Sequence, residues 1–229
     1  MRNFTLMILA AGFGMRMESL TKNIPKPLLK INNSTLLTNT INFFENLGCK
    51  KFLINTHYLH ENLKDYINLK HSNKNIYLIY EPQILDTGGG VKNSIMYFDS
   101  KNFLVVNADI YWDESNINDV NNFIDIIDQF ENYFLLLSNQ KNTLGIEKSY
   151  GDFVIHNDYV RRWMEGDPVI FFSGLQILNP KIFDNFESTK FSMNKIWDKL
   201  ILEKKLKSKI MKSKLFHIGD IKTFNKIIS

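Results

Sequence analysis

The chain has 229 residues, of which 44% are hydrophobic and 23% are charged. These proportions are ordinary for a folded globular protein and exclude an intrinsically disordered chain. The net charge of +4 is mild, and the sequence shows no broad basic face with base-stacking aromatic residues, so no nucleic-acid partner is expected. No apolar run reaches the roughly 20 residues of a membrane-spanning helix. We therefore expect a cytoplasmic protein without a membrane partner, in which the single cysteine, Cys49, is a structural thiol in a reducing compartment.

Short apolar runs alternate with longer helical patterns over the first 138 residues, an order typical of βαβ units around a largely parallel sheet. Strands are predicted over residues 4–9, 51–55, 75–80, 103–106 and 133–137. Helices are predicted over residues 36–47, 57–69, 88–97 and 117–130. The first helix has a candidate N-cap in Ser34 and a glycine, Gly48, directly after its last residue.

The pattern changes after residue 138. Two short runs, residues 152–155 and 159–163, flank a turn at residues 156–158 and predict a β-hairpin. The remaining expected elements are strands over residues 168–178 and 215–218, helices from residue 179 and over residues 193–203, and a closing helix. The lysine-rich run 203–209 is expected to be a solvated helix end.

No linker, repeat or low-complexity segment interrupts the chain, so the sequence predicts a single domain over residues 1–229. Residues 1–138 are expected to form its regular half and residues 139–229 a ligand-specific half. The expected fold class is α/β: a three-layer α/β/α domain with a mixed, mostly parallel central sheet. Ligands bind such sheets beyond the carboxyl ends of the strands. The loops after strands 4–9, 75–80 and 103–106 are therefore expected to meet in one cleft.

The loop after the first strand has the composition of a phosphate-binding loop. Gly12 and Gly14 allow backbone N–H groups to approach phosphates closely, and Arg16 adds a fork of donors. Lys26 stands between two prolines that restrict its backbone. The loop lacks the Gly-Lys-Ser/Thr of a Walker A motif and the third glycine of a dinucleotide fingerprint. A turn with a surface lysine is the alternative, but the combination of features favours phosphate binding.

Two other loops carry chemically unusual residues. Asp109 follows a continuous apolar strand, where its carboxylate suits Mg²⁺, although an ordinary turn-capping role is the alternative. The run 88–90 consists of three glycines, which are costly in conformational entropy and point to the close approach of a ligand rather than a simple helix start. His57 and His60 lie one turn apart, but no third ligand is in view, so zinc is not expected.

Six short motifs in this order resemble the sugar-1-phosphate nucleotidyltransferases. They are residues 9–17 (LAAGFGMRM), 25–28 (PKPL), 85–90 (LDTGGG), 105–109 (VVNAD), 151–153 (GDF) and 172–174 (FSG). Within that family, the order is similar to that of the bacterial N-acetylmuramate α-1-phosphate uridylyltransferases. The resemblance covers almost the whole chain and implies the nucleotide-diphospho-sugar transferase fold, with residues 1–138 as nucleotide-binding half and residues 139–229 as sugar-binding half.

The resemblance implies that UMP is transferred from UTP to a sugar 1-phosphate, with Mg²⁺ as cofactor and pyrophosphate as second product. N-acetylmuramate 1-phosphate is then the expected acceptor, in cell-wall recycling. The attacking phosphate oxygen is already ionised at neutral pH, so no general base is needed and charge neutralisation is the main task. We expect the enzyme to be a monomer or a small homo-oligomer.

The resemblance also assigns residues. Arg16 would stabilise the departing pyrophosphate, Lys26 would bridge the transferred and attacking phosphates, and Asp109 would bind the metal; these three form the expected catalytic set. Gln83 is a possible reader of the nucleobase edge. The expected nucleotide-binding set is Ala11, Gly12, Gly14, Met15, Arg16, Lys26, Glu81, Gly88 and Asn107. The expected sugar-binding set is Thr87, Asn107 and Asp152.

One position departs from the family pattern. His217 stands where the resemblance places a second metal-binding aspartate. Imidazole adds no negative charge and prefers softer ions, so weaker Mg²⁺ binding or tolerance of Mn²⁺ is expected. Asp220, three residues on, is more simply a helix cap.

Two alternatives stay open. A guanylyltransferase for mannose 1-phosphate or heptose 1-phosphate differs only in a few contacts with the base. A non-catalytic regulatory protein that binds nucleotide sugars is suggested by His217, although intact Arg16, Lys26 and Asp109 argue against it.

Overall fold

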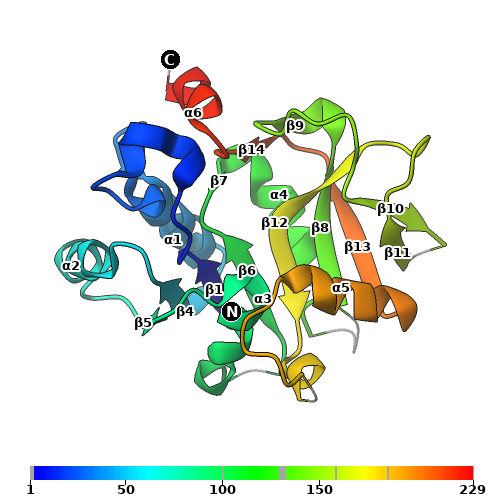
Figure 1. The fold of residues 1–229 in the computed structure, drawn as a ribbon, viewed down its shortest axis with the longest axis horizontal. Helices are drawn as coiled ribbons and strands as arrows, with labels where there is room; N and C mark the ends of the chain where they lie inside the picture. The colour runs from blue at the N-terminus through cyan, green and yellow to red at the C-terminus, as the bar shows by residue number, and fades with distance from the viewer. Residues whose placement is uncertain (1–2, 100, 129–132, 158, 185, 229) are drawn as a thin grey trace.

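A seven-stranded sheet runs through the computed structural model, which describes residues 3–99, 101–128, 133–157, 159–184 and 186–228 (Figure 1). The strands lie in the order β13-β8-β12-β6-β1-β4-β5. Their bounds are β1 (Phe4–Leu9), β4 (Cys49–Thr56), β5 (Ile76–Tyr80), β6 (Phe103–Asn107), β8 (Tyr133–Asn139), β12 (Ile170–Leu178) and β13 (Leu206–Met211). β12 is antiparallel to both its neighbours, and every other neighbouring pair is parallel. The predicted mixed, mostly parallel sheet is confirmed.

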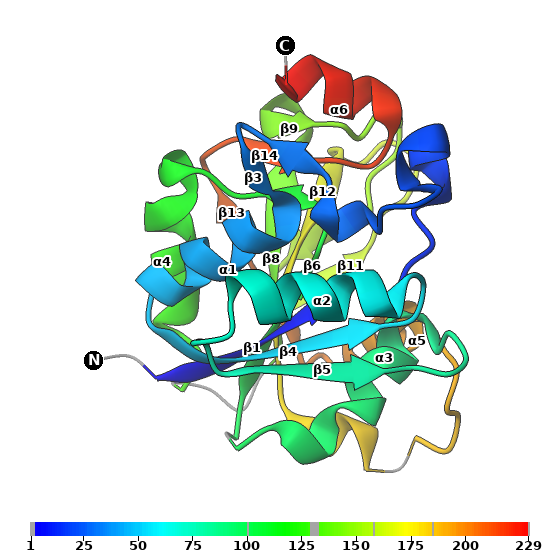
Figure 2. The same cartoon turned by 90° about the vertical axis from the view of Figure 1, so that its left-hand side faces the viewer.

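Helices cover both faces of this sheet. The α-helices are α1 (Leu36–Asn46), α2 (His60–Lys70), α3 (Asp86–Asn93), α4 (Ile117–Ile124), α5 (Met193–Leu202) and α6 (Ile221–Ile228). Apolar residues of α1, α2 and α4 pack in one core cluster, and those of α3 and α5 pack in a second cluster on the opposite face. Figure 2 shows α1 and α2 on the same side of β4 and β5. Successive residues of β1 alternate between the two clusters, with Leu6 and Ile8 in the first and Met7 in the second. Burial on both faces explains why the central strands β1 and β6 consist mostly of apolar residues.

Three small sheets complete the fold. The predicted hairpin is present as β10 (Phe153–His156) and β11 (Tyr159–Arg162), while Asp158 of its predicted turn lies outside the described residues. A second pair, β2 (Lys30–Ile31) with β3 (Ser34–Thr35), leads into α1. The third sheet, β7-β14-β9, joins β7 (Ile110–Tyr111), β14 (Leu215–His217) and β9 (Thr143–Leu144). This sheet places β14, near the C-terminal end of the chain, beside β7, which follows β6.

The lysine-rich run 203–209 begins at the end of α5, where Glu203 is the C-cap, but from residue 206 onward it is a strand and not the expected helix end. Residues 206–211 form β13, which pairs with β8 in parallel register at one edge of the large sheet. Leu206 and Met211 are buried, while Lys209 between them is exposed. Lysines on an edge strand discourage pairing with another chain, so the charges are compatible with a strand at this position.

Several helix boundaries also differ from expectation. Ser34 belongs to β3, and the N-cap of α1 is Thr35, whose hydroxyl accepts a hydrogen bond from Thr38 N. α2 begins at His60 because Leu59, with φ of 50°, interrupts the helical backbone. α3 begins at Asp86 rather than Gly88. α4 ends at Ile124, and residues 129 and 130 of the predicted helix lie outside the described residues.

Strands from both predicted halves share the central sheet. β12, from the second half, lies between β6 and β8 of the first half. The assignment of one half to nucleotide and the other to sugar stays a prediction. Within the described ranges, no helix is long and apolar enough to cross a membrane.

Candidate active site

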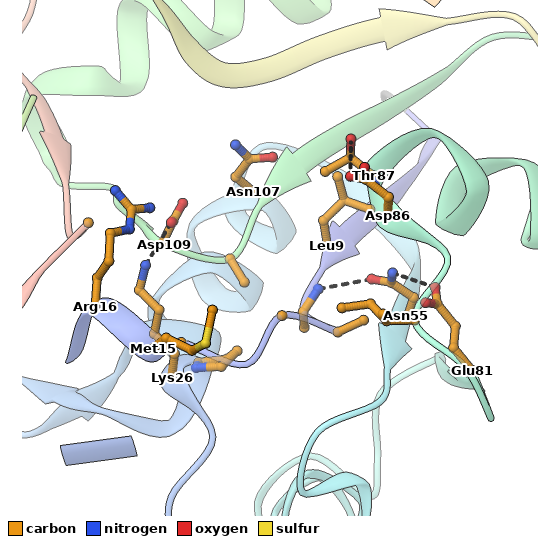
Figure 3. Close-up of a pocket in the computed structure, with 18 residues that line it drawn as sticks. Leu9, Met15, Arg16, Lys26, Asn55, Glu81, Asp86, Thr87, Asn107 and Asp109 are labelled. Atoms are coloured by element: carbon orange, nitrogen blue, oxygen red, sulfur yellow. Dashed lines mark hydrogen bonds and ion pairs between the residues drawn. The ribbon is translucent and has the colours of Figure 1, made fainter. Parts of the chain in front are cut away.

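A cavity of about 500 Å³ opens beyond the carboxyl ends of β1, β4, β5 and β6 (Figure 3). Its lining residues are Leu9, Ala10, Ala11, Gly12, Gly14, Met15, Arg16, Lys26, Pro27, Asn55, Glu81, Ile84, Asp86, Thr87, Asn107, Ala108, Asp109 and Gly219. The loops after β1, β5 and β6 therefore meet as predicted. Arg16, Lys26 and Asp109 lie at one side, which we call the Lys26 end; Asn55, Glu81, Asp86 and Thr87 lie at the other, which we call the Asn55 end (Figure 3).

The two glycines of the first loop serve different purposes. A side chain at Gly12 would meet nothing within 4 Å, so this position is open to the cavity. Gly14 has φ of +66°, and a Cβ atom there would lie 3.1 Å from Lys26 Cβ. Its carbonyl accepts hydrogen bonds from Met17 N at 2.9 Å and from the Thr21 hydroxyl at 3.0 Å. Gly14 thus holds the loop against Lys26, while Gly12 leaves room for a ligand.

The Lys26 side chain reaches Asp109, which follows the end of β6. Its Nζ atom lies 2.7 Å from Asp109 Oδ2, and the side chains of Lys26 and Asp109 are only 12% and 21% exposed. Arg16, in contrast, is exposed and makes no ion pair within the part of the chain that the structure describes. A guanidinium and an ammonium at one end of this open cavity form an anion-binding arrangement that suits a polyphosphate.

His217 is the second neighbour of the Asp109 carboxylate. The pairing of β14 with β7 places His217 opposite Ile110, and Ile218 N donates to the Asp109 carbonyl at 2.8 Å. His217 Nδ1 donates to the Gly145 carbonyl at 3.2 Å, which leaves Nε2 directed to Asp109 Oδ2 at 3.5 Å. His217 and Asp109 are 108 positions apart in the sequence (217 − 109), yet the small sheet brings them together.

The charges around Asp109 control its titration. Burial by itself would raise the pKa of the Asp109 carboxyl, but Lys26 and His217 outweigh burial and hold that pKa well below its usual value. Burial lowers the pKa of His217, and the adjacent Asp109 carboxylate more than offsets this, so that the pKa of His217 is raised. Asp109 is therefore an anion at neutral pH.

Backbone amides and buried hydrogen bonds form the Asn55 end. Asn55 Oδ1 accepts from Ala10 N at 2.9 Å, and Asn55 Nδ2 donates to Glu81 Oε1 at 2.7 Å. The other oxygen of Glu81, Oε2, accepts from Leu85 N at 3.1 Å. Sequence reasoning named Glu81 but missed Asn55 and Asp86. Asn55 is a polar residue near the end of an apolar strand, as Asn107 is, but Asn107 was assigned from the family resemblance and not from this position.

The glycine triplet is explained by contacts within the protein. A Cβ atom at Gly88 would lie 2.4 Å from the Phe191 ring, and one at Gly89 would lie 2.3 Å from the Thr189 carbonyl oxygen. At Gly90, a Cβ atom would lie 2.7 Å from Asn55 Nδ2. The expected close approach is therefore made by protein atoms, which corrects the explanation based on a ligand. Gly88 does not line the cavity, and its role in nucleotide binding stays a prediction.

The expected sugar-binding residues lie in different settings. Thr87 and Asn107 line the cavity, but the Thr87 hydroxyl also accepts a hydrogen bond from Met193 N at 2.9 Å, at the start of α5. Asp152 lies outside the lining set; it pairs with Lys148 at 2.7 Å and accepts from Phe172 N at 3.0 Å. The structure does not bring these three side chains together at one point, and their roles stay predictions.

The remaining singled-out residues have local partners. Asp220 caps α6, as its Oδ1 accepts from Thr223 N at 2.8 Å. His57 Nδ1 donates to the Glu81 carbonyl, and His60 Nδ1 bonds the Thr56 hydroxyl, both at 2.7 Å. Cys49 is buried, and burial raises the pKa of its thiol to about 12, as expected of a structural thiol.

A model of the nucleotidyl transferase family matches residues 5–158, which is more than half of the chain. The chain belongs to this family. This nucleotidyltransferase is 28% identical over 186 residues to the N-acetylmuramate alpha-1-phosphate uridylyltransferase of Neisseria meningitidis, a match that covers 80% of this chain and 78% of that protein. It is 29% identical over 106 residues to a D-glycero-alpha-D-manno-heptose 1-phosphate guanylyltransferase of Campylobacter jejuni, which covers 46% and 48%.

Solved structures support the same assignment. The crystal structure of HddC from Yersinia pseudotuberculosis, complexed with GMP-PN, matches this nucleotidyltransferase with a TM-score of 0.78 and 25% identity over 98% of both chains. A UDP-glucose pyrophosphorylase complexed with UDP-glucose has a TM-score of 0.79 at 16% identity, which shows the shared fold. The expected fold and the expected class of enzyme, a sugar-1-phosphate nucleotidyltransferase, are confirmed.

The family uses divalent metal ions, and the residues at the Lys26 end fit such an ion. Asp109 Oδ1 is buried and has no hydrogen-bond partner within the described residues. His217 Nε2 lies 3.5 Å from Asp109 Oδ2, so the two side chains would both reach one ion once Nε2 has lost its proton. Two protein ligands suit a metal that takes its remaining ligands from waters and substrate phosphates.

Proposed function

We propose that this nucleotidyltransferase transfers UMP from UTP to N-acetylmuramate α-1-phosphate and releases pyrophosphate, in cell-wall recycling in the cytoplasm. The observation that carries the proposal is the cavity itself, with Arg16 and Lys26 at one end and backbone amides around Gly12 between its ends. Two curated relatives with this activity, from Neisseria meningitidis and Caulobacter vibrioides, support the choice of UTP and of the sugar.

The reaction is an in-line displacement at phosphorus. An ionised phosphate oxygen of the sugar 1-phosphate attacks the α-phosphorus of UTP. The bond between that phosphorus and the oxygen that bridges to the β-phosphate breaks, and pyrophosphate leaves with the electron pair. No proton needs to be removed from the nucleophile, so the protein's task is to position and neutralise three anionic groups.

The cationic side chains divide this task. Arg16 binds the pyrophosphate as it departs, because its exposed guanidinium is free to follow the leaving group. Lys26 exchanges its contact with Asp109 for the transferred and attacking phosphates. The amides of Ala11, Gly12, Gly14 and Met15 bind the triphosphate. Thr87, Asn107 and Asp152 are assigned to the sugar and ribose hydroxyl groups.

Asp109 and His217 would hold Mg²⁺, with Mn²⁺ as a possible substitute. The ion supplies charge neutralisation of the triphosphate. Asp109 would contribute the anionic oxygen ligand, and His217 would contribute Nε2 after releasing the proton of that nitrogen, with its Nδ1 proton held by the Gly145 carbonyl.

A guanylyltransferase is the second candidate. The similarity to the D-glycero-alpha-D-manno-heptose 1-phosphate guanylyltransferase of Campylobacter jejuni favours it. The similarity over 98% of both chains to HddC, solved with GMP-PN, agrees with this candidate.

Release of pyrophosphate distinguishes the candidates. The purified protein is incubated with Mg²⁺ or Mn²⁺, each of the four nucleoside triphosphates, and a panel of sugar 1-phosphates that includes N-acetylmuramate, mannose and heptose 1-phosphates. Turnover with UTP and N-acetylmuramate 1-phosphate supports the proposal. Turnover with GTP alone overturns the proposal and supports the guanylyltransferase. Nucleotide-sugar binding without any turnover overturns both candidate functions and supports a regulatory protein.

A further inference from the structure

Asn55 is the side chain that links the loops of the Asn55 end. It lies near the carboxyl end of β4 and is only 3% exposed. Its Oδ1 atom accepts from Ala10 N, in the loop after β1, and its Nδ2 atom donates to Glu81 Oε1, after β5. An N–H requires the amide oxygen and a carboxylate requires the amide nitrogen, so the orientation of the Asn55 amide is fixed by its partners.

Glu81 extends the link to a third loop. Its side chain is buried, with 1% of the residue exposed, and its Oε2 atom accepts from Leu85 N, which directly precedes α3. The main chain of Glu81 is also held, since its N–H donates to the Thr56 carbonyl and its carbonyl accepts from His57 Nδ1. Within the described residues, Glu81 forms no ion pair. Its charge is offset by the N–H donors of Asn55 and Leu85.

The link has no room to rearrange. Gly90, one turn into α3, lies so close that a Cβ atom would be 2.7 Å from Asn55 Nδ2 and 2.8 Å from Glu81 Oε1. Loss of any one bond would leave a buried polar group without a partner. The hydrogen bonds that join Ala10, Asn55, Glu81 and Leu85 therefore fix the distance between the first loop and the start of α3.

We propose that Asn55 is a positioning residue of the nucleotide site, which sets the separation of the Ala10 and Leu85 loops through Glu81. The inference rests on nucleotide binding in this cavity and does not depend on which base or sugar is used. The residues whose positions it sets include Ala11 and Gly12 on one wall and Asp86 and Thr87 on the other, all of which line the cavity. Asn55 thereby determines how tightly a nucleotide fits between the two walls.

This role is tested by exchanging the amide of Asn55 and the carboxylate of Glu81 between the two positions. Asn55→Asp places a second carboxylate against Glu81 and replaces a hydrogen bond by repulsion. Asn55→Asp combined with Glu81→Gln moves the charge to position 55 and preserves every hydrogen bond. One carboxylate oxygen at position 55 accepts from Ala10 N, and the other accepts from the amide nitrogen at position 81. The amide oxygen at position 81 accepts from Leu85 N. The double variant keeps the hydrogen bonds between the two loops and removes the charge from position 81.

The dissociation constants of UTP and of GTP are measured by calorimetry, so that the test does not require turnover. We expect the tighter-binding nucleotide to bind Asn55→Asp about tenfold or more weakly, and to bind the double variant within about threefold of wild type. In steady-state assays, the same pattern is expected in KM, with a smaller change in kcat. If Asn55→Asp binds as wild type does, or if the double variant is as impaired as Asn55→Asp, the inference is overturned; the latter result would show that the charge of Glu81 itself contacts the ligand.

Asn102→Ala is the matched control. Asn102 is also a buried asparagine, 4% exposed, and its side chain bonds the Ile127 carbonyl and Asn179 away from the cavity. It should lose thermal stability without a change in nucleotide affinity. Failure of the proposed uridylyl transfer would appear as the wrong substrate in the pyrophosphate assay, whereas failure of this inference would appear in the binding constants of the variants.

Discussion

The two ends of the cavity are built from different kinds of interaction. The Lys26 end consists of charged side chains, with the Lys26 ammonium 2.7 Å from Asp109 and an exposed Arg16 nearby. The Asn55 end consists of a buried amide and a buried carboxylate that bond backbone N–H groups. Substrate phosphates can replace the ion pair at the first end, because each charge finds a new partner. At the second end, any displacement leaves buried groups unpaired, at about 1–3 kcal/mol each.

This difference separates residues that act on the substrate from residues that hold the walls of the site. Substitutions at the Lys26 end should reduce turnover with little effect on folding. Substitutions around the Asn55 end should reduce stability or affinity. Four experiments examine this distinction.

Asp109→Ala should have the largest effect. It removes the anionic ligand of the expected metal and the partner of Lys26, and we expect kcat to fall by about 10³-fold at every Mg²⁺ concentration. Asp99→Ala is a matched control, because Asp99 also lies 2.7 Å from a lysine, Lys51, but is 77% exposed. Steady-state rates of pyrophosphate release measure both. An active Asp109→Ala enzyme would remove this residue from the reaction.

Gly89→Ala should affect stability, and Gly12→Ala should affect nucleotide affinity. At Gly89, the added Cβ atom would lie 2.3 Å from the Thr189 carbonyl, so we expect a loss of about 1–3 kcal/mol in the free energy of unfolding. At Gly12 the added atom meets nothing within 4 Å, so stability should be unchanged while nucleotide affinity falls. Denaturant unfolding and nucleotide binding are measured for both variants. Equal stability of the two would contradict the close packing of α3.

His217→Asp should change the metal requirement. A second carboxylate beside Asp109 suits Mg²⁺ better than imidazole does, so we expect the Mg²⁺ concentration for half-maximal activity to fall about tenfold, and the preference for Mn²⁺ to decrease. His156→Asp, in the exposed hairpin, is the control. An unchanged metal dependence would exclude His217 as a ligand.

Thr87→Val should have the smallest effect. Loss of the hydroxyl leaves Met193 N without its partner, and we expect about 1 kcal/mol of destabilisation. Thr87→Ser, which retains the hydroxyl, should restore stability. A rise in KM for the sugar 1-phosphate in Thr87→Val but not in Thr87→Ser would establish the sugar contact expected from the sequence, and would show that the Asn55 end also acts on substrate.

The Lys26 end was the more predictable part of the site. Arg16, Lys26 and Asp109 are charged residues in loops that follow apolar strands, and such loops converge in a parallel sheet. The structure brings Lys26 and Asp109 into contact although 82 residues separate them in the chain. Asn55 was missed because a buried amide acquires its role from its partners, Ala10 and Glu81, which periodicity does not identify.

The sequence by itself determined the layered α/β fold, the edge of the sheet where the cavity lies, and the kinds of charge at its Lys26 end. These features follow from local periodicity and from residue type, which are properties of short segments. Tertiary structure decided that residues 206–211 form an edge strand, that Gly88 and Gly89 face Phe191 and Thr189, and that His217 meets Asp109. Each of these depends on which distant segment becomes the neighbour. The packing of the whole core selects that neighbour, because buried apolar faces and backbone hydrogen bonds must all be satisfied at once.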